Sequence, residues 1–203
     1  MHLSLRVLCM TSSPCDLPRP KSAAATKQAM LHAAHKRFLR ESYENVGLRD
    51  IAGDVGVDVA LVSRYFGSKE ELFQAVLHVA EKGEILPPEI SQAEIPAYLA
   101  QMFAQQDTDG SDHVERLLIM LRSVSSPTAS AIVREALRKD VLRPFADRLG
   151  GECAEMRASS LMAVWMGMTI MRTMMAVEPL CQGAADVESR IRRLFEAALT
   201  NEA

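Results

Sequence analysis

Two short amphipathic segments near the amino end are separated by so few residues that they leave little choice of fold. Residues 48–55 and residues 59–65 each place their apolar side chains on one face of a helix. Gly56 ends the first helix, because a residue without a Cβ adopts a positive φ at little cost, and Asp58 is a favourable N-cap for the second. A glycine-containing turn between two short helices predicts a helix-turn-helix whose second helix projects outward.

Longer helices are expected on both sides of this pair. Residues 23–41 carry Phe38 on a single apolar stripe, which predicts a helix that braces the pair. On the other side, Ser68 is followed three residues later by Glu71, a pattern typical of a capping box, and a further helix is expected over residues 69–82. The helix-turn-helix is therefore expected inside a small helical head.

The rest of the chain also has a helical pattern. Beyond a proline-rich segment at residues 83–91, helices are expected at 92–106, 112–124, 127–148, 153–177 and 185–200. Pro144 falls inside one of them and is expected to kink it. Aromatic residues make up only 5% of the chain, and strands favour aromatic and β-branched residues, so the fold class is predicted to be all-α.

The composition excludes several classes of protein. Hydrophobic residues at 48% and charged residues at 24% are typical of globular proteins, and the longest apolar run, residues 161–171, is too short to span a bilayer. We expect a cytoplasmic protein with no membrane segment. The chain also lacks a glycine-rich phosphate loop, a nucleophile elbow and a metal-ligand pattern, so no enzymatic activity, metal or other cofactor is predicted.

The cysteines and two neighbouring histidines are interpreted as structurally unremarkable. No CxxC pair is present, so the four cysteines are expected to be free reduced thiols: Cys9, Cys15, Cys153 and Cys181. The alternative is a sensor thiol or a disulfide. His32 and His35 lie three residues apart without acidic residues in a ligand pattern, and are expected on a solvated surface.

Charge is unevenly distributed along the chain. Residues 1–69 contain ten Lys or Arg against six Asp or Glu, whereas residues 70–203 contain thirteen against twenty. A basic module joined to an acidic one is what a polyanion-binding protein with a second function needs.

The segment from Met30 to Phe73, "MLHAAHKRFLRESYENVGLRDIAGDVGVDVALVSRYFGSKEELF", resembles the DNA-binding domain of the TetR family of transcriptional regulators. A weaker likeness to the ligand-binding half of such regulators comes from Arg157, Gly167, Arg172 and "EPL" at 178–180. The resemblance implies a homodimeric repressor that binds a palindromic double-stranded DNA operator and is released by a small apolar effector. The alternative is a helical small-molecule-binding protein that does not bind DNA.

The resemblance also implies which residues contact DNA. The third helix enters the major groove, and the lysine that opens the next helix contacts a phosphate, where the helix N-terminus adds positive potential. The expected DNA-binding residues are Gly47, Arg49, Val59, Ala60, Leu61, Ser63, Arg64, Tyr65 and Lys69. Because the apolar residues 59–61 contact only apolar groups such as thymine methyls, hydrogen-bond readout is expected from Arg49 and Arg64.

Two of these positions depart from the family pattern. Ser63 stands where a tyrosine is usual, and Gly47 stands where a hydroxyl residue usually caps the second helix. For Arg49 the alternative role is a surface ion pair with Asp50 or Asp54.

The acidic half is expected to bind the ligand and to dimerise. Seven of the twelve methionines fall between residues 156 and 175, in a segment that is apolar nearly all round, so burial by a second copy of the chain is expected there. By resemblance, residues 153–177 and 185–200 form the dimer interface. The expected pocket residues are Met102, Phe103, Met120, Trp165, Met168 and Arg172, with the arginine as the one cationic group.

Each pocket residue has a second interpretation. The methionines are equally suited to ordinary core packing, and Arg172 to a structural ion pair with Glu178 or another carboxylate.

The expected domains are a disordered tail at 1–22, the helix-turn-helix domain at 23–68, and a ligand-binding and dimerisation domain at 69–203.

Overall fold

The computed structural model describes residues 22–79, 86–105, 112–181 and 184–200. All the regular secondary structure in these residues is helical, without a strand, so the all-α prediction is confirmed. None of the described helices is long and apolar enough to cross a bilayer. The disordered tail predicted at 1–22 lies outside the described residues except for Ser22, and so do Cys9 and Cys15. The hydroxyl of Ser22 accepts a hydrogen bond from the N–H of Ala25 at 3.1 Å.

The predicted head is confirmed, and the first three helices begin and end within one residue of the expected positions, whereas the end expected for the fourth, residue 82, lies outside the described residues. Gly56 has a φ of 72° in the left-handed region and ends the first of the two short helices, and the side chain of Asp58 caps the second by accepting from Ala60 N–H at 2.7 Å. The helices of the head and its exit are α1 (Ala23–Arg40), α2 (Leu48–Val55), α3 (Val59–Phe66) and α4 (Lys69–Val79), with a 3₁₀ turn at Tyr43–Asn45.

The turn between α3 and α4 depends on a glycine and on a capping box. Ser68 N–H donates to Glu71 Oε2 at 2.9 Å, and Glu71 N–H donates to Ser68 Oγ at 3.1 Å, which confirms the predicted box. Gly67 has a φ of 76°, and a Cβ there would lie 1.8 Å from Glu71 Oε2. A side chain at Gly67 would therefore strain the backbone and displace the capping carboxylate.

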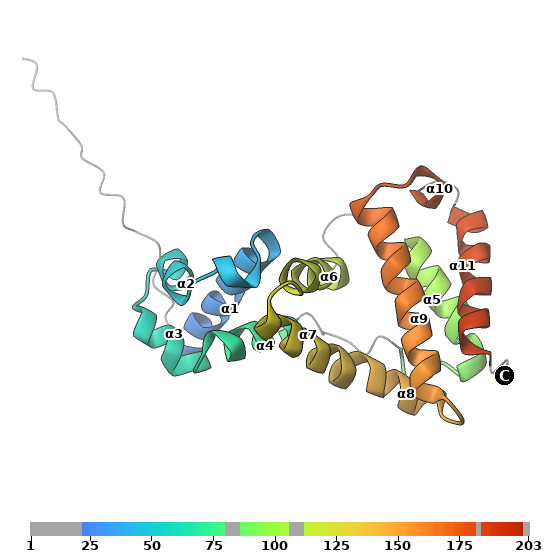
Figure 1. Ribbon diagram of the computed structural model, residues 1–203, viewed down its shortest axis with the longest axis horizontal. Coiled ribbons are helices and arrows are strands. Elements are labelled where there is room, and N and C mark those ends of the chain that lie inside the picture. Colours follow the sequence, from blue (N-terminus) through green and yellow to red (C-terminus); the bar gives the residue numbers. More distant parts are fainter. Residues whose placement is uncertain (1–21, 80–85, 106–111, 182–183, 201–203) are drawn as a thin grey trace, which may run out of the picture.

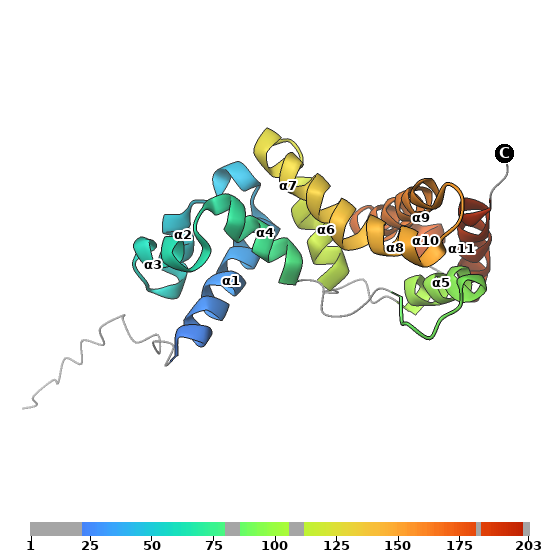
Figure 2. The same ribbon diagram turned by 90° about the horizontal axis from the view of Figure 1, so that it is seen from below.

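The helices of the second half extend from the middle of the molecule to the end opposite the head (Figures 1 and 2). Its members are α5 (Ile95–Gln105), α6 (Asp112–Ser123), α7 (Pro127–Leu137), α8 (Arg143–Leu149), α9 (Ala154–Thr169), α10 (Glu178–Cys181) and α11 (Ala184–Leu199). A 3₁₀ turn at Gln92–Glu94 precedes α5, and π turns occupy Arg138–Leu142 and Ile170–Met174.

The disturbance predicted for Pro144 takes the form of a π turn just before it. Proline has no N–H, and in a regular α-helix its ring clashes with the carbonyl four residues earlier, here that of Asp140. Instead, the N–H of Arg143 bonds to the carbonyl of Arg138, five residues back, which widens this turn. The single helix expected at 127–148 is therefore divided into α7, the π turn and α8.

The long helix expected at 153–177 is shorter than predicted. α9 ends at Thr169, whose hydroxyl bonds back to the carbonyl of Trp165 at 2.9 Å, and a second π turn follows. Ala176 then has a φ of 49°, which an α-helix does not allow. α10 lies in the segment that was expected to be a break, 178–183.

Buried side chains gather in two clusters. The first joins the head and α4 to α6 and α7, and the second lies among α5, α8, α9 and α11. In Figure 1, α6 and α7 stand between the head and the group formed by α5, α9 and α11. The expected domain boundary after residue 68 cuts through the first cluster, because Leu72 and Phe73 of α4 are fully buried in it.

Candidate DNA-binding surface and ligand pocket

The helix expected to read DNA lies on the surface of the head. Within α3, Val62 and Phe66 are buried and anchor the helix to the core. The remaining side chains are exposed at Ala60, Ser63 and Arg64, and half-buried at Val59, Leu61 and Tyr65. All six expected contact residues of this helix are thus accessible to some degree, and its outer face is available to a partner.

Arg49 is exposed on the first turn of α2, and both carboxylates that were alternative partners are engaged elsewhere. Asp50 accepts a hydrogen bond from Gly47 N–H at 2.9 Å. Asp54 accepts two hydrogen bonds from Arg37 of α1, at 2.7 and 2.8 Å, and this pairing lowers the pKa of the Asp54 carboxyl. Within the described residues, the alternative ion pair of Arg49 with Asp50 or Asp54 is therefore not formed.

Gly47 is the N-cap of α2, but it has no side chain with which to cap. Only the return half of a capping box is present, from Asp50 to the Gly47 N–H. A Cβ at Gly47 would lie 2.9 Å from Asp50 Oδ2, so the close approach of this carboxylate depends on the glycine.

Lys69 is held at the amino end of α4 by an aromatic ring. Its Nζ lies 4.2 Å from the centroid of the Tyr43 ring, a cation–π contact. Tyr43 donates its hydroxyl to Glu70 at 3.0 Å, and burial together with this hydrogen bond raises the pKa of Tyr43 above its ordinary value. The ammonium is therefore placed where the unpaired N–H groups of the helix also attract an anion.

One cation near α3 was not expected from the sequence. Lys27 is exposed on α1, and its Nζ lies 5.5 Å from the centroid of the Phe66 ring at the end of α3. This proximity follows from how α1 crosses α3, which no local sequence pattern indicates. Lys27 therefore joins the candidate phosphate-contacting residues.

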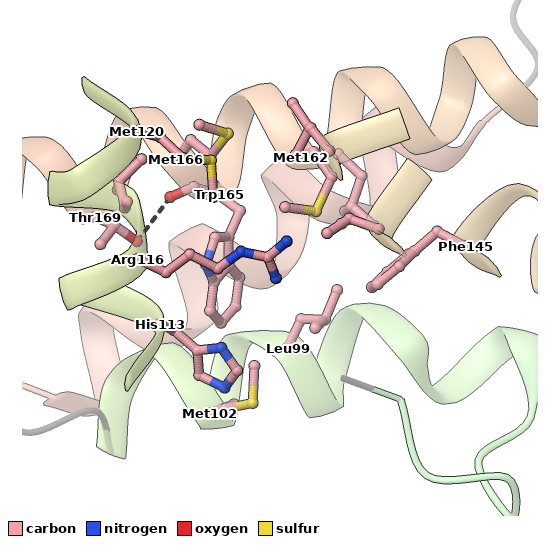
Figure 3. A pocket seen from close by; sticks show the side chains of 14 residues that line it. Leu99, Met102, His113, Arg116, Met120, Phe145, Met162, Trp165, Met166 and Thr169 are labelled. Atoms are coloured by element: carbon pink, nitrogen blue, oxygen red, sulfur yellow. Dashed lines mark hydrogen bonds between the residues drawn. The ribbon is translucent and has the colours of Figure 1, made fainter. Parts of the chain in front are cut away.

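A pocket lies between α5, α6, α8 and α9, with contributions from α7 and its π turn (Figure 3). Its volume is about 70 Å³, counted as the region that the centre of a water-sized sphere can occupy. One water molecule needs roughly 10–15 Å³ on the same measure, so the cavity has room for several. The lining residues are Leu99, Met102, His113, Arg116, Leu117, Met120, Leu137, Val141, Phe145, Leu161, Met162, Trp165, Met166 and Thr169.

The structure brings together three of the six expected pocket residues, Met102, Met120 and Trp165. Phe103, Met168 and Arg172 do not line this cavity. Phe103 is fully buried in the core, where its ring meets that of Trp165 edge to face at 5.9 Å.

Arg172 contacts the end of α5 instead of the pocket. Its guanidinium donates to the carbonyl of Phe103 and, at 3.5 Å, to that of Ala104, and it lies 5.1 Å from the centroid of the Phe103 ring. Carbonyls at a helix C-terminus lack intrahelical partners and attract a cation, so this contact stabilises α5. These contacts support the structural interpretation of Arg172.

The cationic residue that does line the pocket is Arg116, which sequence reasoning missed. It is only 4% exposed, and its Nη2 lies 3.8 Å from Asp140 Oδ2. His113, Leu117 and Met120 of the same helix share the lining. The spacing of these four residues, at i, i+3, i+4 and i+7, was a signal in the sequence that could have found Arg116.

Comparisons with known proteins identify the family to which the chain belongs. A family model described as "Tetracyclin repressor-like, C-terminal domain" matches residues 93–199, more than half of the chain. A second model, "Bacterial regulatory proteins, tetR family", matches residues 30–76, which contain the helix-turn-helix. The chain belongs to the TetR family. It is a DNA-binding transcriptional regulator with a helix-turn-helix head and a helical C-terminal domain.

Solved structures share the fold at low sequence identity. NalD, the secondary repressor of the MexAB-OprM multidrug efflux pump in Pseudomonas aeruginosa, matches with a TM-score of 0.63 and 16% identity, over 89% of this chain and 98% of NalD. Salmonella enterica GusR matches with a TM-score of 0.65 and 13% identity, over 88% and 97%. A TetR-like regulator from Rhodococcus sp. RHA1 matches with a TM-score of 0.59 and 17% identity, over 92% and 100%. A comparison with curated proteins by sequence finds no match.

Proposed function

We propose that this TetR-family chain is a cytoplasmic homodimeric repressor that grips a palindromic operator with paired α3 helices. A small apolar ligand in the pocket releases it from the operator. The observation that carries the proposal is the position of α6, which lines the pocket with one face and contacts the head with another.

The pocket face of α6 consists of His113, Arg116, Leu117 and Met120. The residues between and beyond them contact α1: Glu115 Oε2 lies 3.5 Å from His35 Nε2, and Arg122 donates to the carbonyl of Arg40 at 3.2 Å. A ligand that displaces α6 therefore also displaces its contacts with the head.

The loop after α6 adds another contact between the two halves. The buried Ser126, which caps α7, donates its hydroxyl to the carboxylate of Glu44 in the 3₁₀ turn of the head. Head and pocket are thus joined by packed and hydrogen-bonded groups, through which binding at the pocket can be coupled to the head. A coupling of about 1–3 kcal/mol, typical of such systems, would lower operator affinity roughly 5- to 150-fold when ligand binds.

The single chain leaves an apolar surface uncovered on the helices expected to form the dimer. Met156 is 68% exposed, Met171 40% and Met175 64% along α9 and its continuation, and Leu194 of α11 is 49% exposed. A second copy of the chain would cover these side chains and pair two α3 helices for half-sites about 34 Å apart.

Selection of DNA sites from a random pool by the purified protein tests the proposal. A palindrome with half-sites about one helical turn apart is expected, and its binding constant is expected to fall with salt at a logarithmic slope of about −0.9 per phosphate contact. Failure to enrich any site, with no salt-dependent DNA binding, would instead support the alternative of a helical ligand-binding protein.

Replacing Arg49 or Arg64 with alanine is expected to weaken binding to the selected operator by about 1–3 kcal/mol each, the cost of losing a base-edge contact. Both residues are exposed at the surface that α2 and α3 form. A gel-shift titration measures the loss, and the same variants are expected to bind random-sequence DNA with a smaller change. Equal affinities of wild type and both variants for the operator would contradict the assignment.

Replacing Lys69 with methionine is expected to weaken binding to all DNA sequences nearly equally, and to reduce the salt slope by about one, since a phosphate contact carries no sequence information. Lys139 in the π turn after α7 is exposed, and its replacement by methionine removes the same charge from the other half of the molecule. Titrations of both variants at several salt concentrations compare them. An unchanged slope for the Lys69 variant would remove Lys69 from the DNA contacts.

A further inference from the structure

We propose that the pocket selects an apolar molecule that carries one carboxylate, which Arg116 binds, and that Asp140 passes the effect of binding to His78 of α4. The proposal rests on the proposed function and adds to it the chemical class of the ligand and the route by which the ligand acts.

The lining of the pocket separates one charge from a large apolar surface. Eleven of its fourteen residues are apolar, and the hydroxyl of Thr169 already donates to the carbonyl of Trp165. Arg116 is 4% exposed, and Figure 3 shows its guanidinium pointing into the space next to Trp165 and above His113 and Leu99. A ligand would therefore meet one permanent cation among side chains that are mostly apolar, with the His113 ring and the Trp165 indole N–H as the other polar groups of the lining.

Arginine favours a carboxylate for reasons of geometry. Its planar guanidinium presents parallel N–H groups that match the two oxygens of a carboxylate, and such charge-assisted pairs are stronger than neutral hydrogen bonds. The distance from Arg116 Nη2 to Asp140 Oδ2, 3.8 Å, is that of an ion pair rather than of a hydrogen bond. A ligand carboxylate able to approach to hydrogen-bond distance would therefore compete with Asp140 for the guanidinium.

Asp140 lies between the pocket and α4. Its Oδ2 is also 3.1 Å from Nδ1 of His78, near the end of α4. The side chains of Asp140 and Arg116 are 7% and 5% exposed, so their charges interact through protein rather than through water. Asp140 is held in the π turn Arg138–Leu142, a kind of turn that recurs at functional sites.

A second carboxylate beside Arg116 changes the balance of forces on Asp140. The ligand withdraws part of the attraction of Arg116 and adds repulsion between two anions, so Asp140 and the histidine that it contacts have to shift. His78 lies at the opposite end of α4 from Lys69, and the helix between them is packed into the core of the head through Leu72 and Phe73. A shift at His78 thus reaches the helix that carries the phosphate-contacting lysine.

Trp165 provides a direct measurement of ligand binding. It is the only tryptophan of the chain and it lines the pocket, so its fluorescence reports occupancy without any DNA. Octanoate and octanamide have the same carbon chain and differ in charge. Octanoate is expected to bind about 10- to 100-fold more tightly, the range that a charge-assisted hydrogen bond supplies. Equal affinities, or tighter binding of octanamide, would overturn the proposal.

Variants at Arg116 test the assigned contact. Arg116→Met is expected to abolish the preference for octanoate over octanamide while still binding the amide, and Arg116→Lys to retain part of the preference. Arg143→Met removes a charge from the exposed face of α8, outside the pocket, and should keep the full preference. Preference retained in Arg116→Met, with its helicity intact by circular dichroism, would overturn the contact.

Variants at His78 test the route. His78→Leu is expected to bind octanoate as the wild type does, by Trp165 fluorescence, but to lose most of the effect of octanoate on operator affinity, measured by anisotropy against its own ligand-free value. An octanoate effect equal to that of the wild type would overturn the role of His78.

The same measurements separate this proposal from the proposed function. If the protein binds no DNA, the repressor function fails, whereas the Trp165 titration still decides the ligand class. If octanamide rather than octanoate weakens operator binding, the repressor function stands and the carboxylate class is wrong.

Discussion

Replacing Phe38 with alanine is expected to lower the free energy of unfolding by about 3–5 kcal/mol, the range found for large aromatic residues removed from a core. Phe38 is fully buried, with its ring edge to face with that of Phe73 at 4.8 Å and stacked on that of Tyr43 at 6.1 Å. The rings around it leave little freedom to fill the cavity, so the upper half of this range is expected. Since Tyr43 also holds Lys69, operator binding should weaken as well.

Urea unfolding followed by circular dichroism measures the loss. His32→Ala is the matched control, because His32 lies on the same helix but is exposed, and surface replacements usually change stability by less than about 0.5 kcal/mol. A loss below about 1 kcal/mol for Phe38→Ala would contradict the central place of this ring in the first cluster. A typical domain is stable by only about 5–15 kcal/mol, so the expected loss is a large part of the total.

The head could be predicted from the sequence because its signals are local. The positive φ of Gly56, the cap at Asp58 and the box between Ser68 and Glu71 each involve residues within four positions of one another. Such interactions act in the same way wherever the helices are placed, so the residue types alone indicate them. The exposure of Arg49 and Arg64 then follows from the face that the buried residues define.

The pocket could be predicted only in part, because its lining depends on how distant helices cross. Arg172 was expected in it as the cation of an apolar segment, but the π turn after Thr169 places the residue beside the end of α5. Arg116 takes that place from α6, whose sequence has a more ordinary mixture of charged and apolar residues. The spacing of Arg116 with Leu117 and Met120 indicates that the three share one face of α6, but not that this face lines a cavity.

The helix ends of the second half were the least predictable for a related reason. A proline inside a helix predicts that the regular hydrogen bonding is interrupted there. Whether the helix then bends, ends or forms a wider π turn depends on the side chains that pack against it. Here Val141 within the π turn and Phe145 just beyond it are both buried in the second cluster, so the widened turn keeps their side chains in the core. The contacts that decide this come largely from α9, a separate helix whose packing angle the sequence around Pro144 does not indicate.

The replacement of Gly167 with glutamate is expected to have the largest effect on function, because it places charge in the middle of the proposed dimer surface. Gly167 is exposed on α9, and a Cβ there would meet no atom within 4 Å, so the single chain accommodates a side chain without strain. The change also removes a glycine from a helix, which by itself stabilises the helix by about 0.5–1 kcal/mol. The monomer is therefore expected to fold at least as stably as before.

In a two-fold dimer the same patch of both copies meets, so each assembly would bury two new charges near one another. An uncompensated buried charge costs about 3–5 kcal/mol, which corresponds to a loss of roughly a hundredfold to several thousandfold in dimer affinity. Analytical ultracentrifugation is expected to show a monomer, and operator affinity to fall by a similar factor because two linked heads are needed for both half-sites. Gly167→Ala, which adds only a methyl group, controls for the loss of glycine. If the Gly167→Glu variant stayed a dimer and bound the operator normally, the two chains would have to meet through a surface other than α9.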